Sequence, residues 1–182
     1  VSKEQIELAK AEEHKNSFGI QYFVSGPEDI EKKLIKSFGN NLELFDKASS
    51  TLVLHYAKDR KHLTKFFSST FRLLKHKGIF CAIFTNPDFQ SMNKASYNRL
   101  FARENGKMRV DFLDSNGKVK VSAYFSDLSR KDYEFAAKKA GFESFKWIKL
   151  KVNKEGIKKM GSDFWKDYEK DCPYIGFVTV KK

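Results

Sequence analysis

The stretch "LLKHKGIFCAIFTNP" (73–87) decides how this chain folds. A helix-like run ends in basic residues and Gly78, where a helix C-terminus favours cations and a glycine. Six apolar residues follow in seven positions, and Asn86-Pro87 ends the run. Because the run is apolar on both faces, it is typical of a strand that is covered by helices on both sides of a parallel sheet.

This run therefore predicts a central core strand with two buried faces. One face would carry Phe80, Ala82 and Phe84, and the other Ile79, Cys81 and Ile83. The alternative is an RNA-reading strand, which should alternate and hold its aromatic side chains on an open face. The RNP1 pattern is matched only in part, because Ile79 and Phe80 interrupt it.

The composition favours one packed domain that spans residues 1–182. Of the 182 residues, 41% are hydrophobic and 15% aromatic, which is enough to form a core. No apolar run approaches the roughly 18 residues that a membrane-spanning helix needs. Cys81 and Cys172 lie far apart and form no CxxC motif. Two reduced thiols in a cytoplasmic protein are the expected state.

The net charge of +12 raises the question of nucleic-acid binding. Only six of the 35 basic residues are arginine, the usual reader of bases, and the lysines are spread evenly along the sequence. This distribution is typical of a solvated surface, so we expect a nucleic-acid partner to be unlikely. A lysine-rich RNA-binding module remains an alternative.

Helix and strand signals alternate along the chain. The first helix is expected over 3–16, with Ser2 and Gln5 as its capping box. Further helices are expected from Pro27 to Gly39, from Asp59 to about 77, over 129–140, and briefly within 161–171. Strands are expected over 19–24, 44–54, 79–85, 145–150 and 174–180. In the last of these helices, the aromatic side chains of Phe164, Trp165 and Tyr168 would lie on one stripe, which favours packing in the core. This order is that of an α/β doubly wound sheet.

A hairpin interrupts this order. The stretch "KMRVDFLDSNGKVKVSAYF" (107–125) alternates with period two on both sides of Asn116-Gly117, which is a strong hairpin signal. We predict that residues 88–125 form an elaboration over the substrate side.

Five stretches, in collinear order, resemble class I S-adenosylmethionine-dependent methyltransferases. They are "SKEQIELAKAEE" (2–13), "FDKASSTLVLHYA" (45–57), "FRLLKHKGIFCAIFTNP" (71–87), "AGFESFKWIKL" (140–150) and "YIGFVTVKK" (174–182). The resemblance implies a Rossmann-like, mostly parallel sheet, S-adenosylmethionine as the cofactor and a small-molecule methyl acceptor. Such a reaction is an in-line displacement that needs positioning and no metal.

The same resemblance implies where the ligands bind. Gly26, Pro27 and Glu28 would lie against the adenine, and the backbone of Ser50, Thr51 and Leu52 would face the cofactor. His55, Tyr56 and Asn86 would be the polar groups at the substrate side. For His55 and Tyr56, a hydrogen-bonded structural pair is an equal alternative.

Two features of the family are missing from this sequence. The glycine-rich cofactor loop is absent, and the acid that holds the ribose hydroxyls would fall just before Val1. We therefore expect the domain to be N-terminally incomplete, with the first two strands absent, and to bind the cofactor weakly or not at all by itself. A methyltransferase-like module that assembles or binds without catalysis is the alternative.

Overall fold

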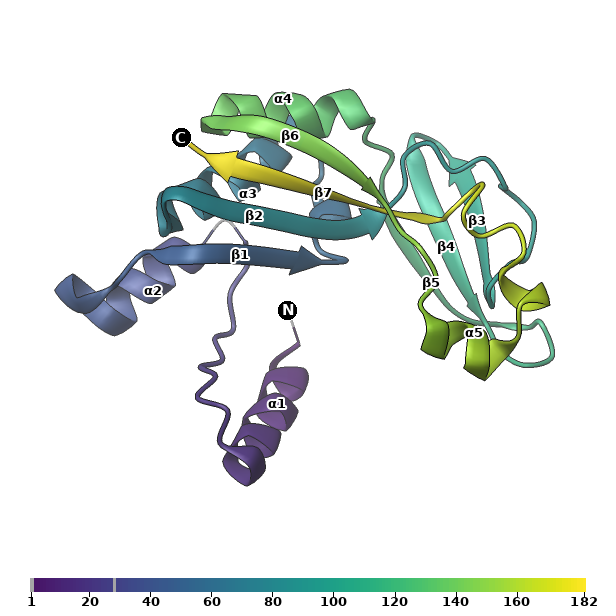
Figure 1. Ribbon diagram of the computed structural model, residues 1–182, viewed down its shortest axis with the longest axis horizontal. Helices are drawn as coiled ribbons and strands as arrows, with labels where there is room; N and C mark the ends of the chain where they lie inside the picture. Colours follow the sequence, from purple (N-terminus) through teal and green to yellow (C-terminus); the bar gives the residue numbers. More distant parts are fainter. Residues whose placement is uncertain (1, 28) are drawn as a thin grey trace.

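A four-stranded sheet forms the body of the protein in the computed structural model, which describes residues 2–27 and 29–182. Its strands lie in the order β1 (Phe45–Thr51), β2 (Leu74–Thr85), β7 (Tyr174–Lys181) and β6 (Phe142–Lys149). β1 and β2 are parallel, and β7 runs antiparallel between β2 and β6 (Figure 1). The predicted α/β fold is confirmed, but the sheet is mixed: only β1 and β2 pair in parallel, and both pairs that β7 makes are antiparallel.

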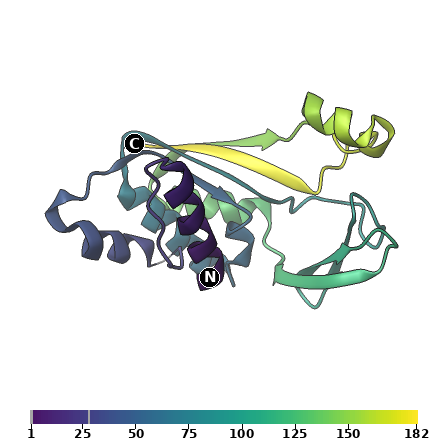
Figure 2. The same cartoon turned by 90° about the horizontal axis from the view of Figure 1, so that it is seen from below.

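Two helices cover one face of this sheet. They are α3 (Arg60–Leu73) and α4 (Arg130–Ala140), which lie beneath the strands in Figure 2. Phe67 of α3 has no exposed surface, and its ring lies 5.5 Å from the rings of both Phe80 and Phe177. A fully buried aromatic side chain contributes about 2–3 kcal/mol through its apolar area, so this contact fixes α3 on the sheet.

The opposite face of the sheet is open, which contradicts the prediction that both faces of 79–85 are buried. Cys81 is exposed and Ile83 is 40% exposed, whereas Phe80 and Phe84 are buried. The reason is that α3 and α4 pack on the same side, and no described helix covers the other. The aromatic residues of β2 face the helices, so the open face is not an RNA-reading surface with exposed rings.

The helix before β2 ends earlier than the sequence predicted. α3 stops at Leu73 and β2 begins at Leu74, so the basic residues up to Lys77 belong to the strand and its irregular start. The ammonium group of Lys181 donates hydrogen bonds to the carbonyls of Phe71 and Leu74, at 2.8 and 2.6 Å. A cation from β7 thus satisfies helix-terminal carbonyls in place of the predicted basic turn.

A second, three-stranded sheet lies beside the body (Figure 1). It is an antiparallel meander of β3 (Arg99–Glu104), β4 (Lys107–Leu113) and β5 (Val119–Ser126). β4 and β5 pair across Asn116-Gly117, which confirms the predicted hairpin. β3 was not predicted from the sequence, although Asn105-Gly106 connects it to β4 with positive φ at both residues, as a type I′ turn requires.

The described residues before β1 form two α-helices and no strand. α1 (Lys3–Asn16) begins at Ser2, whose hydroxyl accepts from the Gln5 amide at 3.2 Å. The predicted N-cap is therefore confirmed, but the return bond of the capping box, from the Ser2 amide to the Gln5 side chain, is not formed in the described structure. α1 buries no residue, and its C-terminal end is the part that stands farthest from the body (Figure 1). The predicted strand over 19–24 is wrong, because those residues pair with no described strand.

α2 (Ile30–Phe38) follows and ends at Gly39, as predicted. It begins three residues later than the predicted start at Pro27. A short 3₁₀ turn, η1 (Gly39–Asn41), leads into β1. The outer edge of β1 pairs with no strand in the described part of the chain, so the expected completing segment stays a prediction.

Between β6 and β7 the chain forms α5 (Lys154–Met160) and the 3₁₀ turn η3 (Asp163–Trp165). The sequence predicted the short helical stretch that contains η3, but it did not predict α5. The ring of Trp165 stacks on Tyr97 at 5.6 Å, and Tyr168 and Phe164 meet Tyr97 edge-on. This cluster joins the segment to the end of the three-stranded sheet.

Replacing Gly141 with alanine should destabilise the fold by about 1.5 kcal/mol. Gly141 ends α4 with φ +107°, and an added Cβ would lie 2.9 Å from the ring of Phe71. Gly117→Ala is the matched control, since its φ is +75° and its Cβ would have no neighbour within 4 Å. Urea unfolding should show the larger loss for Gly141→Ala, and equal losses would exclude the Phe71 contact as a cause.

Candidate functional site

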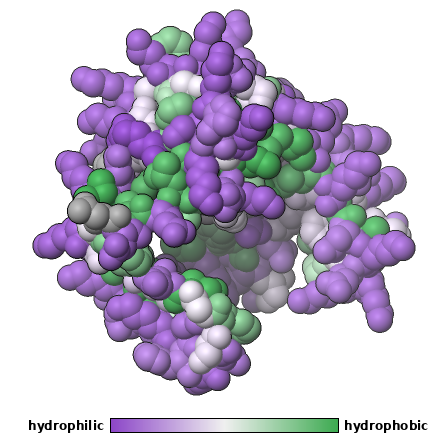
Figure 3. Space-filling view, turned by 60° about the vertical axis from the view of Figure 1, so that its left-hand side comes forward, coloured by the Kyte–Doolittle hydropathy of each residue, from purple (hydrophilic) through white to green (hydrophobic). Residues whose placement is uncertain are grey.

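A hollow of about 850 Å³ lies at the open edge of β1, between this strand, the loop before α2 and the start of α1. Five of the residues that the sequence analysis selected line it together: Gly26, Pro27, Ser50, Thr51 and Tyr56. Phe66 and Phe80 form part of its apolar wall. Figure 3 shows apolar side chains gathered around a hollow on this side of the molecule. Its volume is in the range of small-molecule sites.

The loop before α2 is held in a tight turn. The Asp29 amide donates to the carbonyl of Gly26 at 3.1 Å, and the ammonium of Lys33 donates to the carbonyl of Val24 at 2.9 Å. Proline fixes the backbone at Pro27, so the turn presents a rigid edge to the hollow. The predicted cofactor residue Glu28 lies outside the described residues.

The chain leaves β1 through a strained residue. Leu52 has φ +55°, a left-handed conformation that costs a non-glycine residue about 1–2 kcal/mol. Its amide donates to the carbonyl of Ile83 at 2.8 Å, which extends the parallel pairing by one residue. The Leu52 side chain is 42% exposed and does not line the hollow. Strain of this kind concentrates at functional sites, which supports a role for this end of β1.

His55 is buried where the two sheets meet. It lies in the 3₁₀ turn η2 (Leu54–Tyr56), with its ring 4.6 Å from that of Tyr56 and 4.5 Å from that of Phe125 in β5. Burial lowers the pKa of His55 to about 4, so the imidazole is neutral at pH 7. Its Nδ1 atom has no hydrogen-bond partner among the described residues.

The contact between His55 and Tyr56 is a ring contact, and no hydrogen bond joins their side chains in the described structure. Tyr56 is 54% exposed and lines the hollow, whereas His55 lies behind it. The two neighbouring side chains therefore have different surroundings. Tyr56 faces the hollow, and the buried His55 ring packs against it.

The side chain and the backbone amide of Asn86 already form hydrogen bonds within the fold. Its side-chain amide donates to the carbonyl of Cys172 at 2.9 Å, and its side-chain oxygen accepts from the Asp88 amide at 3.1 Å. The Asn86 backbone amide donates to the carbonyl of Pro173. These bonds join the end of β2 to the start of β7, and Asn86 does not line the hollow.

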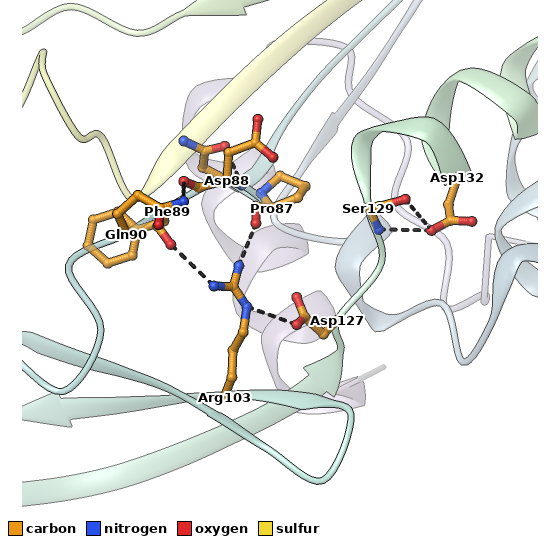
Figure 4. A network of polar contacts seen from close by, with 9 residues as sticks. Pro87, Asp88, Phe89, Gln90, Arg103, Asp127, Ser129 and Asp132 are labelled. Carbon is orange, nitrogen blue, oxygen red and sulfur yellow. Dashed lines mark hydrogen bonds and ion pairs between the residues drawn. The ribbon is translucent and has the colours of Figure 1, made fainter.

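A network around Arg103, which the sequence analysis did not select, holds the loop that follows Asn86 (Figure 4). The Arg103 guanidinium pairs with Asp127 at 2.8 Å and donates to the carbonyls of Pro87 and Phe89. Arg130 at the start of α4 pairs with Asp88 at 2.5 Å. Two arginines from different elements thus fix residues 87–89 beside the carboxyl end of β2.

Three further properties of the described residues bear on the site. No group of three or more His, Cys, Asp or Glu side chains is arranged to hold a metal ion. No helix in residues 2–27 and 29–182 is long and apolar enough to cross a membrane. Both cysteines are free thiols.

Several solved structures share this fold. An S-adenosylmethionine-dependent methyltransferase from Clostridium acetobutylicum matches with a TM-score of 0.63 and 13% identity, covering 99% of this chain and 72% of that one. The PH0226 protein from Pyrococcus horikoshii matches with a TM-score of 0.59 and 15% identity, covering 100% and 69%. The sugar N-methyltransferase KedS8 from Streptoalloteichus matches at 0.50 and 17%, covering 77% and 57%.

At these identities the likeness shows the fold, and the predicted Rossmann-like methyltransferase fold is confirmed. The chain spans between about half and three quarters of the length of these structures. Neither a protein-family model nor a curated protein matches the sequence.

Proposed function

We propose that this chain belongs to an enzyme that transfers a methyl group from S-adenosylmethionine to a small-molecule acceptor. The hollow at the end of β1 is the main support for the proposal, because the expected cofactor residues line it together. Gly26 and Pro27 line it from the loop before α2, and Ser50 and Thr51 line it from β1. Ligands of open α/β sheets bind outside the carboxyl ends of the strands, where this hollow lies. The fold shared with methyltransferases supports the same conclusion.

The residues around the hollow fit such a cofactor. The hydroxyls of Ser50 and Thr51 can hydrogen-bond polar ligand atoms, and the absence of a side chain at Gly26 lets the backbone approach closely. The exposed ring of Tyr56 can pack against a flat base or an acceptor. When bound, S-adenosylmethionine supplies a methyl group on a sulfonium, and the acceptor loses a proton as it is methylated.

The chain's own contribution is positioning. Tyr56 borders the space where an acceptor would lie, and neutral His55 holds the Tyr56 ring from behind. The three-stranded sheet contacts this turn through the rings of Phe125 and His55, although none of its described residues lines the hollow. A small-molecule acceptor is supported by the like-folded sugar N-methyltransferase. A site that orients two reactants can accelerate this displacement without forming a covalent bond to the protein.

Titration with S-adenosylmethionine should shift the backbone NMR signals of Gly26, Ser50 and Thr51. We expect weak binding, because the outer edge of β1 is open in the described structure. Ser50→Leu fills part of the hollow and should weaken binding about tenfold, equivalent to about 1.4 kcal/mol. Ser162→Leu, on an exposed turn, is the matched control and should bind like the wild type.

Two results would contradict this site. One is unchanged affinity in Ser50→Leu, which would place the cofactor elsewhere. The other is the absence of any shift at saturating cofactor concentrations, which would favour a methyltransferase-like module without catalysis.

A further inference from the structure

A basic groove of about 840 Å³ lies on the outer side of α3, between α2 and α4. Six cationic side chains from the three helices line it: Lys32, Arg60, Lys61, Lys65, Arg72 and Lys139. Asp29 is the acidic residue in the described lining. The groove shares none of its described lining residues with the hollow at β1, so it is a separate surface.

The two arginines are already paired. Arg60 binds Asp132 of α4 at 2.5 Å, and Arg72 binds Glu31 of α2 at 2.6 Å. These pairs join α3 to its neighbours at the two ends of the groove. Their charges are neutralised and their guanidinium groups are held in place, so the arginines frame the groove.

The lysines between them are available to a partner. Lys61, Lys65 and Lys139 are exposed, and none of them has an ion pair in the part of the chain that the structure describes. Lys61 and Lys65 are one helical turn apart, about 6 Å along α3, so they point to the same side. Lysines that are evenly spread in the sequence are thus gathered by the fold into one positive surface, which attracts polyanions.

The chemistry of the groove fits a nucleic acid better than an acidic protein. The planar fork of arginine suits two-pronged recognition of a particular carboxylate, phosphate or base, but both groove arginines are already paired with acidic side chains. The remaining lysines bind phosphates as point charges, which fits a polyphosphate chain held without sequence preference. The groove also contains Phe135, which is 48% exposed and lies 5.1 Å from the guanidinium carbon of Arg60. An exposed aromatic ring beside cations is the usual platform on which an unpaired base stacks.

We propose that this groove binds single-stranded RNA without sequence preference. Lys61, Lys65 and Lys139 contact successive phosphates, and Phe135 stacks with a base. The RNA is a bound partner and not the methyl acceptor, because the groove lies on a different surface from the proposed methyl-transfer site.

Fluorescence anisotropy with a labelled oligouridylate of about 12 nucleotides tests the proposal. The triple variant Lys61→Gln, Lys65→Gln, Lys139→Gln should bind about tenfold more weakly, and its slope of log affinity against log salt should fall by about 2. Phe135→Ala should bind about tenfold more weakly with an unchanged slope. The matched control is Lys151→Gln, Lys158→Gln, Lys159→Gln, which removes the same charge from exposed positions near α5 and should change affinity less than twofold.

Three results would overturn the proposal. Equal losses in the two triple variants would show that net charge, and not the groove, drives binding. A polyglutamate peptide that competes as well as unlabelled RNA at equal charge would assign the groove to acidic proteins. A duplex that binds as tightly as the single strand would exclude stacking on Phe135.

Discussion

Lowering the pH from about 6.5 to about 4 should destabilise the fold by about 3 kcal/mol through His55 alone. Burial lowers the pKa of His55 in the folded protein to about 4, from 6.5. As the pH falls between these values, the unfolded chain takes up the proton and the folded protein does not. The stabilisation is therefore complete above pH 6.5 and is lost progressively down to pH 4.

The variant His55→Gln tests this effect, because glutamine does not titrate. Urea unfolding at several pH values should show a flatter pH dependence for His55→Gln than for the wild type over this interval. His76→Gln is the control, since it removes an exposed histidine at the start of β2. Parallel curves for wild type and His55→Gln would mean that His55 is not kept neutral by burial.

The same burial bears on the proposed reaction. An imidazole that is neutral at pH 7 can accept a proton, and the Nδ1 atom of His55 has no partner among the described residues. The ring is separated from the hollow by Tyr56, however. We therefore place His55 as a positioning residue that holds Tyr56, and the contacts with Tyr56 and Phe125 join the body to the three-stranded sheet.

Local signals in the sequence predicted most elements because those elements are locally determined. The capping box of Ser129 and Asp132, the glycine that ends α4 and the alternation around Asn116-Gly117 all depend on neighbours within a few residues. β3 was missed although Asn105-Gly106 carries the same signal, because the polar residues before it obscured the strand. The Asn105-Gly106 turn, taken as a hairpin signal by itself, would have predicted β3.

Features that depend on distant partners were the ones that failed. Whether Ile79, Cys81 and Ile83 are buried depends on which helices cross the sheet, and the pattern of the strand cannot specify that. The run at 19–24 has strand-forming residues, but a strand also needs a neighbour, and no described strand provides one. Tertiary context therefore overrode local preference in both places.

The residues of the candidate site were predicted only in part, because some of them also depend on distant partners. Gly26, Pro27, Ser50, Thr51 and Tyr56 were selected through the resemblance to a family, and the fold brings them to one hollow. Asn86 was selected for its place after β2, yet its amide is used by the loop before β7, which is 86 residues away in the sequence. Arg103 gave no signal, since its partners lie in two other segments and are partly backbone carbonyls.

Arg103 should control the order of the loop after β2. Its guanidinium binds Asp127 and two carbonyls of residues 87–89, and so links the three-stranded sheet, the start of α4 and the carboxyl end of β2 (Figure 4). The side chains of Arg103 and Asp127 are 36% and 26% exposed, so water screens the pair. We expect the whole network to contribute about 2 kcal/mol, less than the sum of three charge-assisted bonds.

Replacing Arg103 with alanine should therefore speed hydrogen exchange at the amides of Phe89 and Gln90 about 30-fold, which corresponds to about 2 kcal/mol of lost protection. Arg103→Lys keeps the charge but loses the planar fork, so its effect should be intermediate. Arg109→Ala is the matched control, because Arg109 pairs with Glu104 and Asp111 inside the three-stranded sheet and should leave these amides protected. If both alanine variants increase exchange equally across residues 87–91, Arg103 only stabilises its own sheet. If Arg103→Ala acts selectively, the loop beside the proposed substrate side is held from a distance, and such displacements reduce the rate of reactions that depend on orientation.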